Sequence, residues 1–303
     1  DEVLGWNRPY IAEIPQQLLR DGKNEVTMRI GTGVYWHVGI GTVQIGPSAL
    51  LEAQRSHIFF WRIPGVMIAQ GVMMAATVYA LLLWLLGWRD RRALLWSLIG
   101  IFWLLRNLHF FVERPLFDAI WFRDISHYLI YFVVALTYSF CAEVFDVKRR
   151  RLFNILQYSF AIFICILRYI LIQQQISDVL CNILALISGV SVIYIAVIAY
   201  WRSRQFDHLL ILTGLVAATA FSLHDVGRTS NVLAWDGLGF FLQPYAGFVM
   251  AWAFFVPIAL NIVRSFHDTS QMNIVLENKV REVSAALKDS EARLREQQVI
   301  LAV

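Results

Sequence analysis

Seven long apolar runs occupy most of this chain between residues 64 and 263. Each run is roughly 20 residues long, the length that a helix needs to cross roughly 30 Å of hydrocarbon. The sequence therefore predicts a polytopic α-helical protein that is embedded in the lipid bilayer. The expected spans, each placed within a few residues, are Pro64–Leu86, Ala93–Val112, Ile125–Phe145, Leu152–Ile172, Val179–Tyr200, His208–Val226 and Leu238–Val263.

The composition agrees with this class. Of the 303 residues, 58% are hydrophobic and 16% are charged, whereas a soluble domain carries about 25% charged residues. The net charge of +4 comes from positive residues in short loops, so it does not predict a nucleic-acid partner. The cysteines Cys141, Cys165 and Cys181 lie in apolar runs without a CxxC partner, so we expect neither disulfides nor cysteine metal sites.

The loops differ in positive charge, and this difference predicts the orientation of the spans. "WRDRR" (88–92), "KRRR" (148–151) and "WRSR" (201–204) follow the first, third and fifth spans. The alternate loops "QQQISD" and "GRTSNVLAWDG" carry no positive residue and one, respectively. Positive loops face the cytoplasm, and an odd number of spans puts the two ends on opposite sides. We therefore expect the N-terminus outside and the C-terminus in the cytoplasm.

Residues 1–57 have a different pattern from the spans. "RDGKNEVTMRIG" contains a turn signal followed by alternating apolar and polar residues, and "WHVGIGTVQIG" is a second strand-like run. Two or three strands are not stable alone. We expect them to be the closing strands of an extracytoplasmic β-sandwich, and we expect the chain to be a piece cut at both ends.

The segment after the last span, residues 266–303, has a heptad pattern. With Val280 at position a, about four heptads predict a parallel two-stranded coiled coil, and hence a homodimer. Ser290 and Gln297 fall at d positions and weaken the seam. The alternative is a single solvated helix, which would expose the apolar a positions. The expected seam residues are Leu276, Val280, Val283, Leu287, Leu294 and Leu301.

Polar side chains in the spans concentrate towards the expected outer end of the bundle. Ionisable residues within membrane spans are costly and often functional. One interpretation is a set of interhelical ion pairs, such as Arg106 with Glu113 or with Asp225. The other is an outward-facing pocket for an unknown small molecule, or the face that meets the periplasmic domain. The candidate pocket residues are Arg106, Asn107, His109, Glu113, His127, Arg168, His224, Asp225 and Gln243.

A metal site is a weaker alternative, and no metal is expected. His109 and Glu113 have i, i+4 spacing, and His127, His224 and Asp225 are the residues that would complete a zinc site. No nucleophile elbow, P-loop, kinase glycine loop or HExxH motif is present. We therefore expect no catalytic residue and no cofactor in this chain.

Three stretches resemble one known family. "IPQQLLRDGKNEVTMRI" (14–30) is similar to the closing strands of a galactose-binding-like jelly roll. The stretch from His57 to Phe111 is similar to the first two spans of the bacterial seven-transmembrane receptors with diverse intracellular signalling modules. "LENKVREVSAALKDSEARLREQQ" (276–298) resembles the signalling helix that enters a histidine kinase.

This resemblance implies the input half of a two-component sensor histidine kinase in the bacterial inner membrane. It implies residues 1–57 as the end of a periplasmic jelly roll, 58–265 as the receptor domain and 266–303 as the signalling helix. A kinase module beyond Val303 would bind ATP and Mg²⁺ and phosphorylate a response regulator. The alternatives are a diguanylate cyclase as the output, or else a transporter or an intramembrane metallohydrolase.

Overall fold

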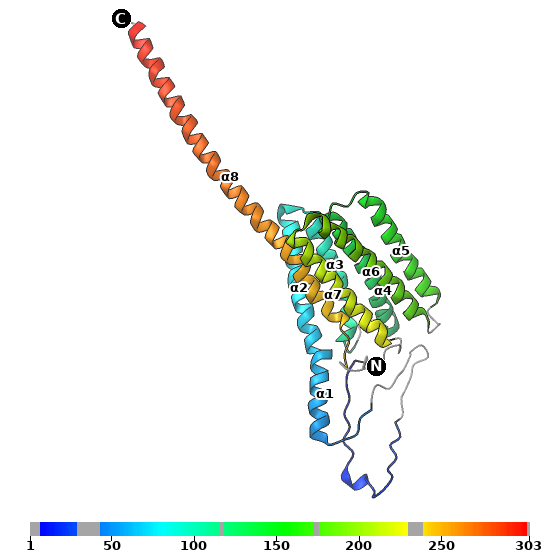
Figure 1. The fold of residues 1–303 in the computed structure, drawn as a ribbon. Coiled ribbons are helices and arrows are strands. Elements are labelled where there is room, and N and C mark those ends of the chain that lie inside the picture. Colours follow the sequence, from blue (N-terminus) through cyan, green and yellow to red (C-terminus); the bar gives the residue numbers. More distant parts are fainter. Residues whose placement is uncertain (1–6, 29–42, 115–117, 172–175, 230–238, 302–303) are drawn as a thin grey trace. The chain divides into compact units, whose positions relative to one another are not determined.

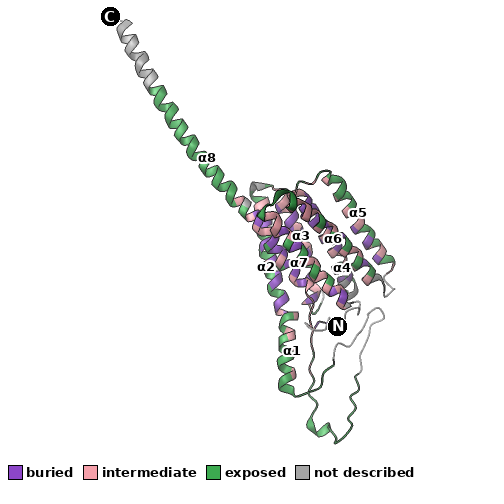
Figure 2. Ribbon diagram, in the orientation of Figure 1, coloured by how far each residue is buried: buried purple, intermediate pink, exposed green. Residues whose placement is uncertain are grey.

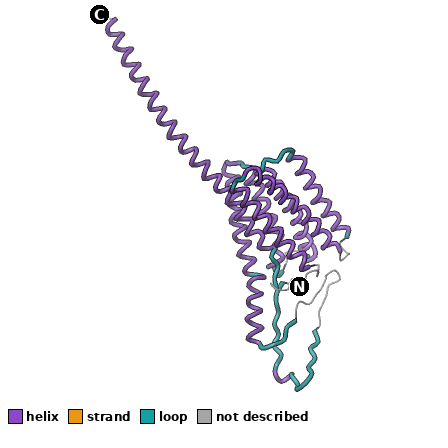
Figure 3. The backbone as a smooth tube through the Cα atoms, viewed as in Figure 1, coloured by secondary structure: helices purple, strands orange, loops and turns teal. Residues whose placement is uncertain are grey.

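The computed structural model describes residues 7–28, 43–114, 118–171, 176–229 and 239–301, and these ranges contain helices but no strand (Figure 1; Figure 3). Two short 3₁₀ helices are η1 (Gln16–Leu18) and η3 (Leu108–Phe110), and η2 (Trp84–Trp88) is a π-helix. The α-helices are α1 (Ser48–Arg62), α2 (Pro64–Leu83), α3 (Arg91–Asn107), α4 (Ala119–Val144), α5 (Arg150–Ile170), α6 (Ile176–Ser203), α7 (Phe206–Thr229) and α8 (Gln243–Leu301).

Within the described ranges, seven helices are long and apolar enough to cross a bilayer. They coincide with the seven predicted runs, and the protein is a multi-pass membrane protein. The first run begins where the sequence places it. Ile63 precedes a proline and leaves the helical conformation (φ −121°, ψ −73°), and Pro64 then opens α2. A proline disfavours the helical conformation in the residue before it but suits the first helical turn.

The region expected to hold strands is only partly described. Residues 23–28, the first part of the expected alternation, form a loop. Residues 29–42, which contain the end of the first expected strand and most of the second, lie outside the described residues. The jelly-roll end therefore stays a prediction. α1 runs from Ser48 to Arg62, across the boundary that we expected at residue 57.

The chain divides into two compact units, Asp1–Phe255 and Val256–Val303. In the first unit, α3 packs against α2 and α4, α5 packs against α4 and α6, and α6 packs against α7. Buried residues concentrate on α2, α3 and α4, whereas α5 is largely exposed (Figure 2). An apolar helix surface without protein cover is typical of contact with lipid chains.

An aromatic cluster joins three helices of the first unit. The indole of Trp96 on α3 stacks on the Phe254 ring of α8 with centroids 5.5 Å apart, and Phe140 of α4 lies edge-on to Phe254 at 5.2 Å. Trp96, Phe140 and Phe254 are fully buried. Such aromatic pairs contribute about 0.5–1.5 kcal/mol beyond the burial of their area, so this cluster fixes α3, α4 and the first part of α8 together.

The basic loops meet at one end of the first unit. The Glu143 carboxylate of α4 lies 3.1 Å from Nη1 of Arg150 on α5 and 3.8 Å from Nη1 of Arg91 on α3. In the loop before α3, the carboxylate of Asp90 accepts the backbone N–H of Arg92 at 2.9 Å and caps the helix. Glu143, a lone acid near the end of its run, therefore connects the ends of three helices.

The second unit is the remainder of α8, with Pro257 inside the helix. The side chains of Leu276, Val280, Val283 and Leu287 are 57–63% exposed. Those of Leu294 and Leu301 lie outside the described residues. An apolar seam on the surface of one chain fits a coiled coil, and the coiled coil stays a prediction.

Candidate functional site

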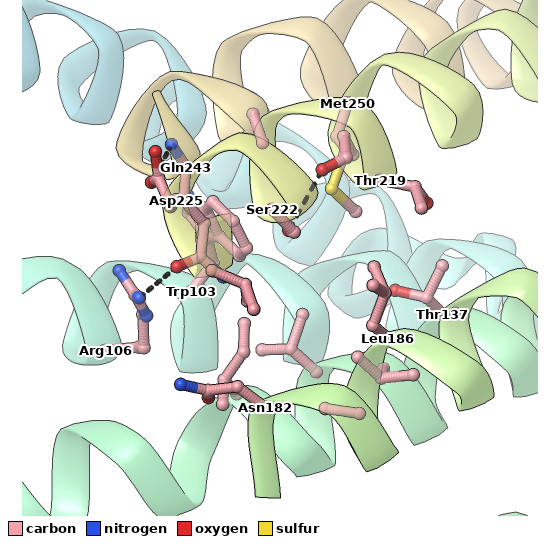
Figure 4. Close-up of a pocket in the computed structure, with 18 of the residues that line it drawn as sticks. Trp103, Arg106, Thr137, Asn182, Leu186, Thr219, Ser222, Asp225, Gln243 and Met250 are labelled. Carbon is pink, nitrogen blue, oxygen red and sulfur yellow. Dashed lines mark hydrogen bonds between the residues drawn. The ribbon is translucent and has the colours of Figure 1, made fainter. Parts of the chain in front are cut away.

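A cavity of about 470 Å³ lies inside the first unit, lined by η3 and by residues of α3, α4, α6, α7 and the first turns of α8 (Figure 4). Its volume is within the range of pockets that hold small molecules, about 300–1,000 Å³. The polar lining residues Arg106, Asp225 and Gln243 lie at the end of α3, near the end of α7 and at the start of α8, and the lining continues to the middle of α4, α6 and α7. These three helix ends lie opposite the basic loops, so the polar part of the cavity is at the end that the sequence predicts.

The two ends of the cavity differ in polarity. Arg106, Asp225 and Gln243 lie together at one end, and Thr219 and Met250 lie towards the other (Figure 4). The walls between them are largely apolar, and are formed by Ile130, Val133, Val134, Ala185, Leu186, Val192 and Leu215. The cavity therefore suits a molecule with one polar end and an apolar body.

The polar end is built around Gln243, the first residue of α8. Arg106 of α3 donates from Nη2 to the Gln243 side-chain Oε1 at 2.5 Å. Asp225 of α7 accepts the backbone N–H groups of Leu242 and Gln243 at 2.9 and 2.7 Å, one on each carboxylate oxygen. A helix begins with N–H groups that have no partner inside the helix, and it favours negative charge there. Asp225 therefore caps α8 from another helix.

Two further helices hold the next residues of α8. Nε2 of Gln70, a buried residue of α2, donates to the carbonyl of Pro244 at 3.0 Å. The Tyr245 hydroxyl donates to the carbonyl of Trp61 on α1. Pro244 has no N–H, which suits the first turn of a helix. The start of α8 thus receives polar contacts from α1, α2, α3 and α7.

The structure brings five of the nine predicted pocket residues to this cavity and leaves four outside its lining. The five are Arg106, His109, His127, Asp225 and Gln243, and the four are Asn107, Glu113, Arg168 and His224. The His109 and His127 rings are nearly parallel, with centroids 6.1 Å apart. They join η3 to α4 at the polar end.

Two of the other four residues support the lining. Asn107 is fully buried, accepts a hydrogen bond from Arg106 Nη1 at 2.6 Å, and donates to the Trp103 carbonyl at 2.9 Å. His224 Nδ1 lies 2.8 Å from Oδ1 of Asp225. They act on the site through Arg106 and Asp225.

Arg168 belongs to a separate buried pair. Its guanidinium is 2% exposed and lies 3.9 Å from the Asp124 carboxylate. The pair joins α5 to α4. The prediction that Arg168 lines the pocket is not supported by this geometry.

The predicted i, i+4 pair of His109 and Glu113 on one helix face is wrong, because α3 ends at Asn107. The Asn107 side chain bonds the Trp103 carbonyl, and His109 Nδ1 lies 2.7 Å from the Arg106 carbonyl. The His109 ring thus satisfies the Arg106 carbonyl, which a further helical turn would have used. Glu113 is exposed and lies 3.6 Å from Arg8, so of the two ion pairs considered for Arg106, the one with Glu113 is not formed.

Among the described residues, no group of three or more His, Cys, Asp and Glu side chains is arranged to hold a metal ion. Several contributors to the site were missed from the sequence, among them Gln70 and Thr137. Gln70 is the lone amide in the first span and was the available signal, because polar groups inside spans are costly. Thr137 lines the apolar part of the cavity, and a single threonine in an apolar run gives no such signal.

Comparison with known proteins gives one match. A family model described as 7TM diverse intracellular signalling matches residues 66–261, well over half of the chain. No curated protein and no solved structure is significantly similar to the chain. The matched region contains all the helices that line the cavity and ends within α8. The chain therefore belongs to the 7TM diverse intracellular signalling family, a family of seven-transmembrane receptor domains with a role in intracellular signalling.

Proposed function

We propose that this chain is the sensing half of a two-component histidine kinase. In this proposal the cavity binds a small ligand and α8 carries the response to a kinase module. One observation carries the proposal: Gln243, the first residue of α8, is bonded to Arg106 and Asp225, which both line the cavity. A ligand at the polar end competes for the groups that hold the start of α8.

The energetics favour a switch of this kind. A ligand changes a conformational equilibrium only by its difference in affinity for the two states. A charge-assisted hydrogen bond contributes about 1.5–3 kcal/mol. Breaking the bond between Arg106 and Gln243 therefore has enough energy to change a two-state ratio by about tenfold or more. A helix shift of about 1–2 Å is a known response in receptors and allosteric proteins.

The continuity of α8 supports a mechanical output. One helix runs from Gln243 to Leu301 and contains both the first turn at the cavity and the heptad segment. In our proposal two copies pair through Leu276, Val280, Val283 and Leu287, and the polar d position at Ser290 makes the pairing easy to shift. The kinase output rests on the resemblance of residues 276–298 to a signalling helix.

The proposed topology places the N-terminus in the periplasm and the C-terminus in the cytoplasm. It rests on the positive charge of three loops, and the ion pairs of Glu143 bring two of them, 88–92 and 148–151, to one end. A membrane-impermeant maleimide on intact cells tests it with a single new cysteine. Gln44→Cys should be labelled and Lys148→Cys should not, and the reverse pattern would overturn the topology. The native Cys141 and Cys181 are buried, which keeps the background low.

The functional test uses the full-length protein in membrane vesicles. Gln243→Leu removes the acceptor for Arg106 at similar size, and should change autophosphorylation from ATP several-fold. Gln205→Leu is a matched control, because Gln205 is exposed in the loop before α7 at the end with the basic loops. Equal output from both variants and the parent protein would refute the role of Gln243.

A second experiment tests the rigid helix and the type of output. Insertions of one to four residues after Lys288 should give output that follows the heptad phase. Output that is independent of phase would refute transmission along α8. Conversion of GTP to cyclic diguanylate, without autophosphorylation, would establish the alternative of a cyclase module.

A further inference from the structure

Several charged side chains are buried at the end of the first unit that lies opposite the basic loops. An ionised side chain away from water is costly unless an opposite charge or several hydrogen bonds compensate it. Arg168 is compensated by Asp124, whose carboxylate lies 3.9 Å from its guanidinium. Asp225 is compensated by the N–H groups of Leu242 and Gln243 at the positive end of α8.

Arg106 differs from these two residues. It is 8% exposed, and its hydrogen-bond acceptors are the amide oxygens of Asn107 and Gln243, at 2.6 and 2.5 Å. Its guanidinium also lies over the Phe110 ring, 5.1 Å from the centroid. Asp225 is near enough to favour the Arg106 charge through space, but within the described part of the chain no carboxylate forms an ion pair with Arg106 at 4.0 Å or less. Its partners at hydrogen-bond distance are therefore neutral.

The cavity lies directly beside this charge. Arg106 lines it, and a guanidinium has five N–H donors in a planar fork that fits carboxylate and phosphate oxygens. The bonds to Asn107 and Gln243 use only part of that set. Asn182 lines the cavity as well, and its side-chain NH₂ group is a further donor for an acidic head.

The rest of the cavity selects the body of the ligand. Ile130, Val133, Leu186, Leu215 and Met250 line it beyond the polar end. Apolar walls favour a hydrocarbon body, at about 25 cal/mol for each Å² of apolar surface removed from water. A small sugar or a free phosphate would leave these walls without contact.

We infer that the cavity binds an amphipathic anion, with an acidic head on Arg106 and an apolar body along α4, α6 and α7. This inference rests on the proposed function only in taking the cavity as the receptor site. Free fatty acids and anionic phospholipids share this chemistry. The acidic head replaces the Gln243 oxygen as the acceptor on Arg106, which frees the first turn of α8 from α3.

Binding is measured on the full-length protein in phosphatidylcholine nanodiscs. The probe is radiolabelled decanoate, with decanol and decylamine as matched neutral and cationic competitors. Decanoate should bind saturably, and unlabelled decanoate should displace it at least about tenfold better than either competitor. Nanodiscs that contain phosphatidylglycerol form a second arm. Loss of decanoate binding there identifies the phospholipid as the occupant, and unchanged binding identifies the free acid.

Two variants connect binding to the charge. Arg106→Gln should weaken decanoate binding about tenfold to a hundredfold, while Arg106→Lys should keep part of the affinity because it keeps the charge. Arg150→Gln is the matched control, because Arg150 pairs with Glu143 at the other end of the unit, and it should bind as the parent protein does.

The outcomes separate this inference from the proposed function. Equal binding of decanoate, decanol and decylamine to the unaltered protein, or no decanoate binding in either lipid, overturns the inference. Either result leaves open a different ligand that acts through Gln243. Binding that depends on Arg106 without any change in autophosphorylation supports the inference and refutes the proposed function.

Discussion

Replacement of Asp225 by asparagine tests whether this residue anchors the start of α8. The carboxylate accepts two backbone N–H groups, one on each oxygen, from Leu242 at 2.9 Å and from Gln243 at 2.7 Å. Asparagine has a single carbonyl oxygen, and its NH₂ group would face the second N–H. One of the two N–H groups therefore loses its acceptor.

Asp225→Asn should lower the free energy of unfolding by about 2 kcal/mol. A buried donor without an acceptor costs about 1–3 kcal/mol, and the lower half of that range applies because Leu242 and Gln243 are half-buried. Loss of a negative charge at a helix N-terminus adds about 0.3–1 kcal/mol. For a domain of this size, a loss of about 2 kcal/mol lowers the Tm by roughly 4–8 °C.

The chain carries its own reporter for this measurement. Cys141 and Cys181 are buried and Cys165 is half-buried, so a thiol-reactive fluorescent dye reacts with them mainly after unfolding. Dye fluorescence against temperature in detergent then gives the Tm of the purified protein. Hydrogen exchange at Leu242 and Gln243 should also become faster in the variant.

Asp146→Asn is the matched control. Asp146 is exposed in the loop before α5, and its backbone is left-handed (φ 47°), a conformation that asparagine accepts readily. The free energy of unfolding of this variant should differ from that of the parent protein by no more than about 0.5 kcal/mol. If Asp225→Asn and Asp146→Asn had the same Tm, the proposed capping of α8 by Asp225 would be refuted.

Four further substitutions have different expected outcomes. Gly247→Ala should lower the Tm because its Cβ would collide with the Trp103 ring, and overpacking costs about 1–3 kcal/mol. Gly71→Ala has nothing within 4 Å of the new Cβ. It should raise the free energy of unfolding by up to about 1 kcal/mol and therefore raise the Tm; a lower Tm would contradict this. Glu143→Gln should lower the free energy of unfolding by no more than about 1 kcal/mol, because both arginine partners are partly exposed. A larger decrease in the same dye assay would contradict this. Val280→Lys should abolish disulfide-independent cross-linking between copies in vesicles, and persistent dimers would exclude the predicted seam.

The spans were predictable because a bilayer imposes a length and an apolar composition on each helix. Pro64 opens α2, where the first predicted span begins, and Asp90 caps α3, a cap that was not predicted from the sequence. The concentration of polar residues at one end was predictable from the alternation of the spans. Five of those residues lie on one cavity.

The remaining features depend on contacts between distant residues. Asp225 caps a helix that begins 18 positions later, whereas the usual capping signal comes from the residue directly before the helix. The end of α3 at Asn107 is accompanied by a contact of the His109 ring with the Arg106 carbonyl, in a run whose apolar pattern continues. The separation of Arg168 from the cavity results from its pairing with Asp124 on another helix.

The attachment of α8 has a consequence for how such receptors diversify. The polar contacts described for this helix within the first unit reach Gln243, Pro244 and Tyr245. On the proposed mechanism, a downstream module must only continue the helix in the correct phase to receive the same input. Recombination after the last span would then exchange one output for another without any change in the ligand site.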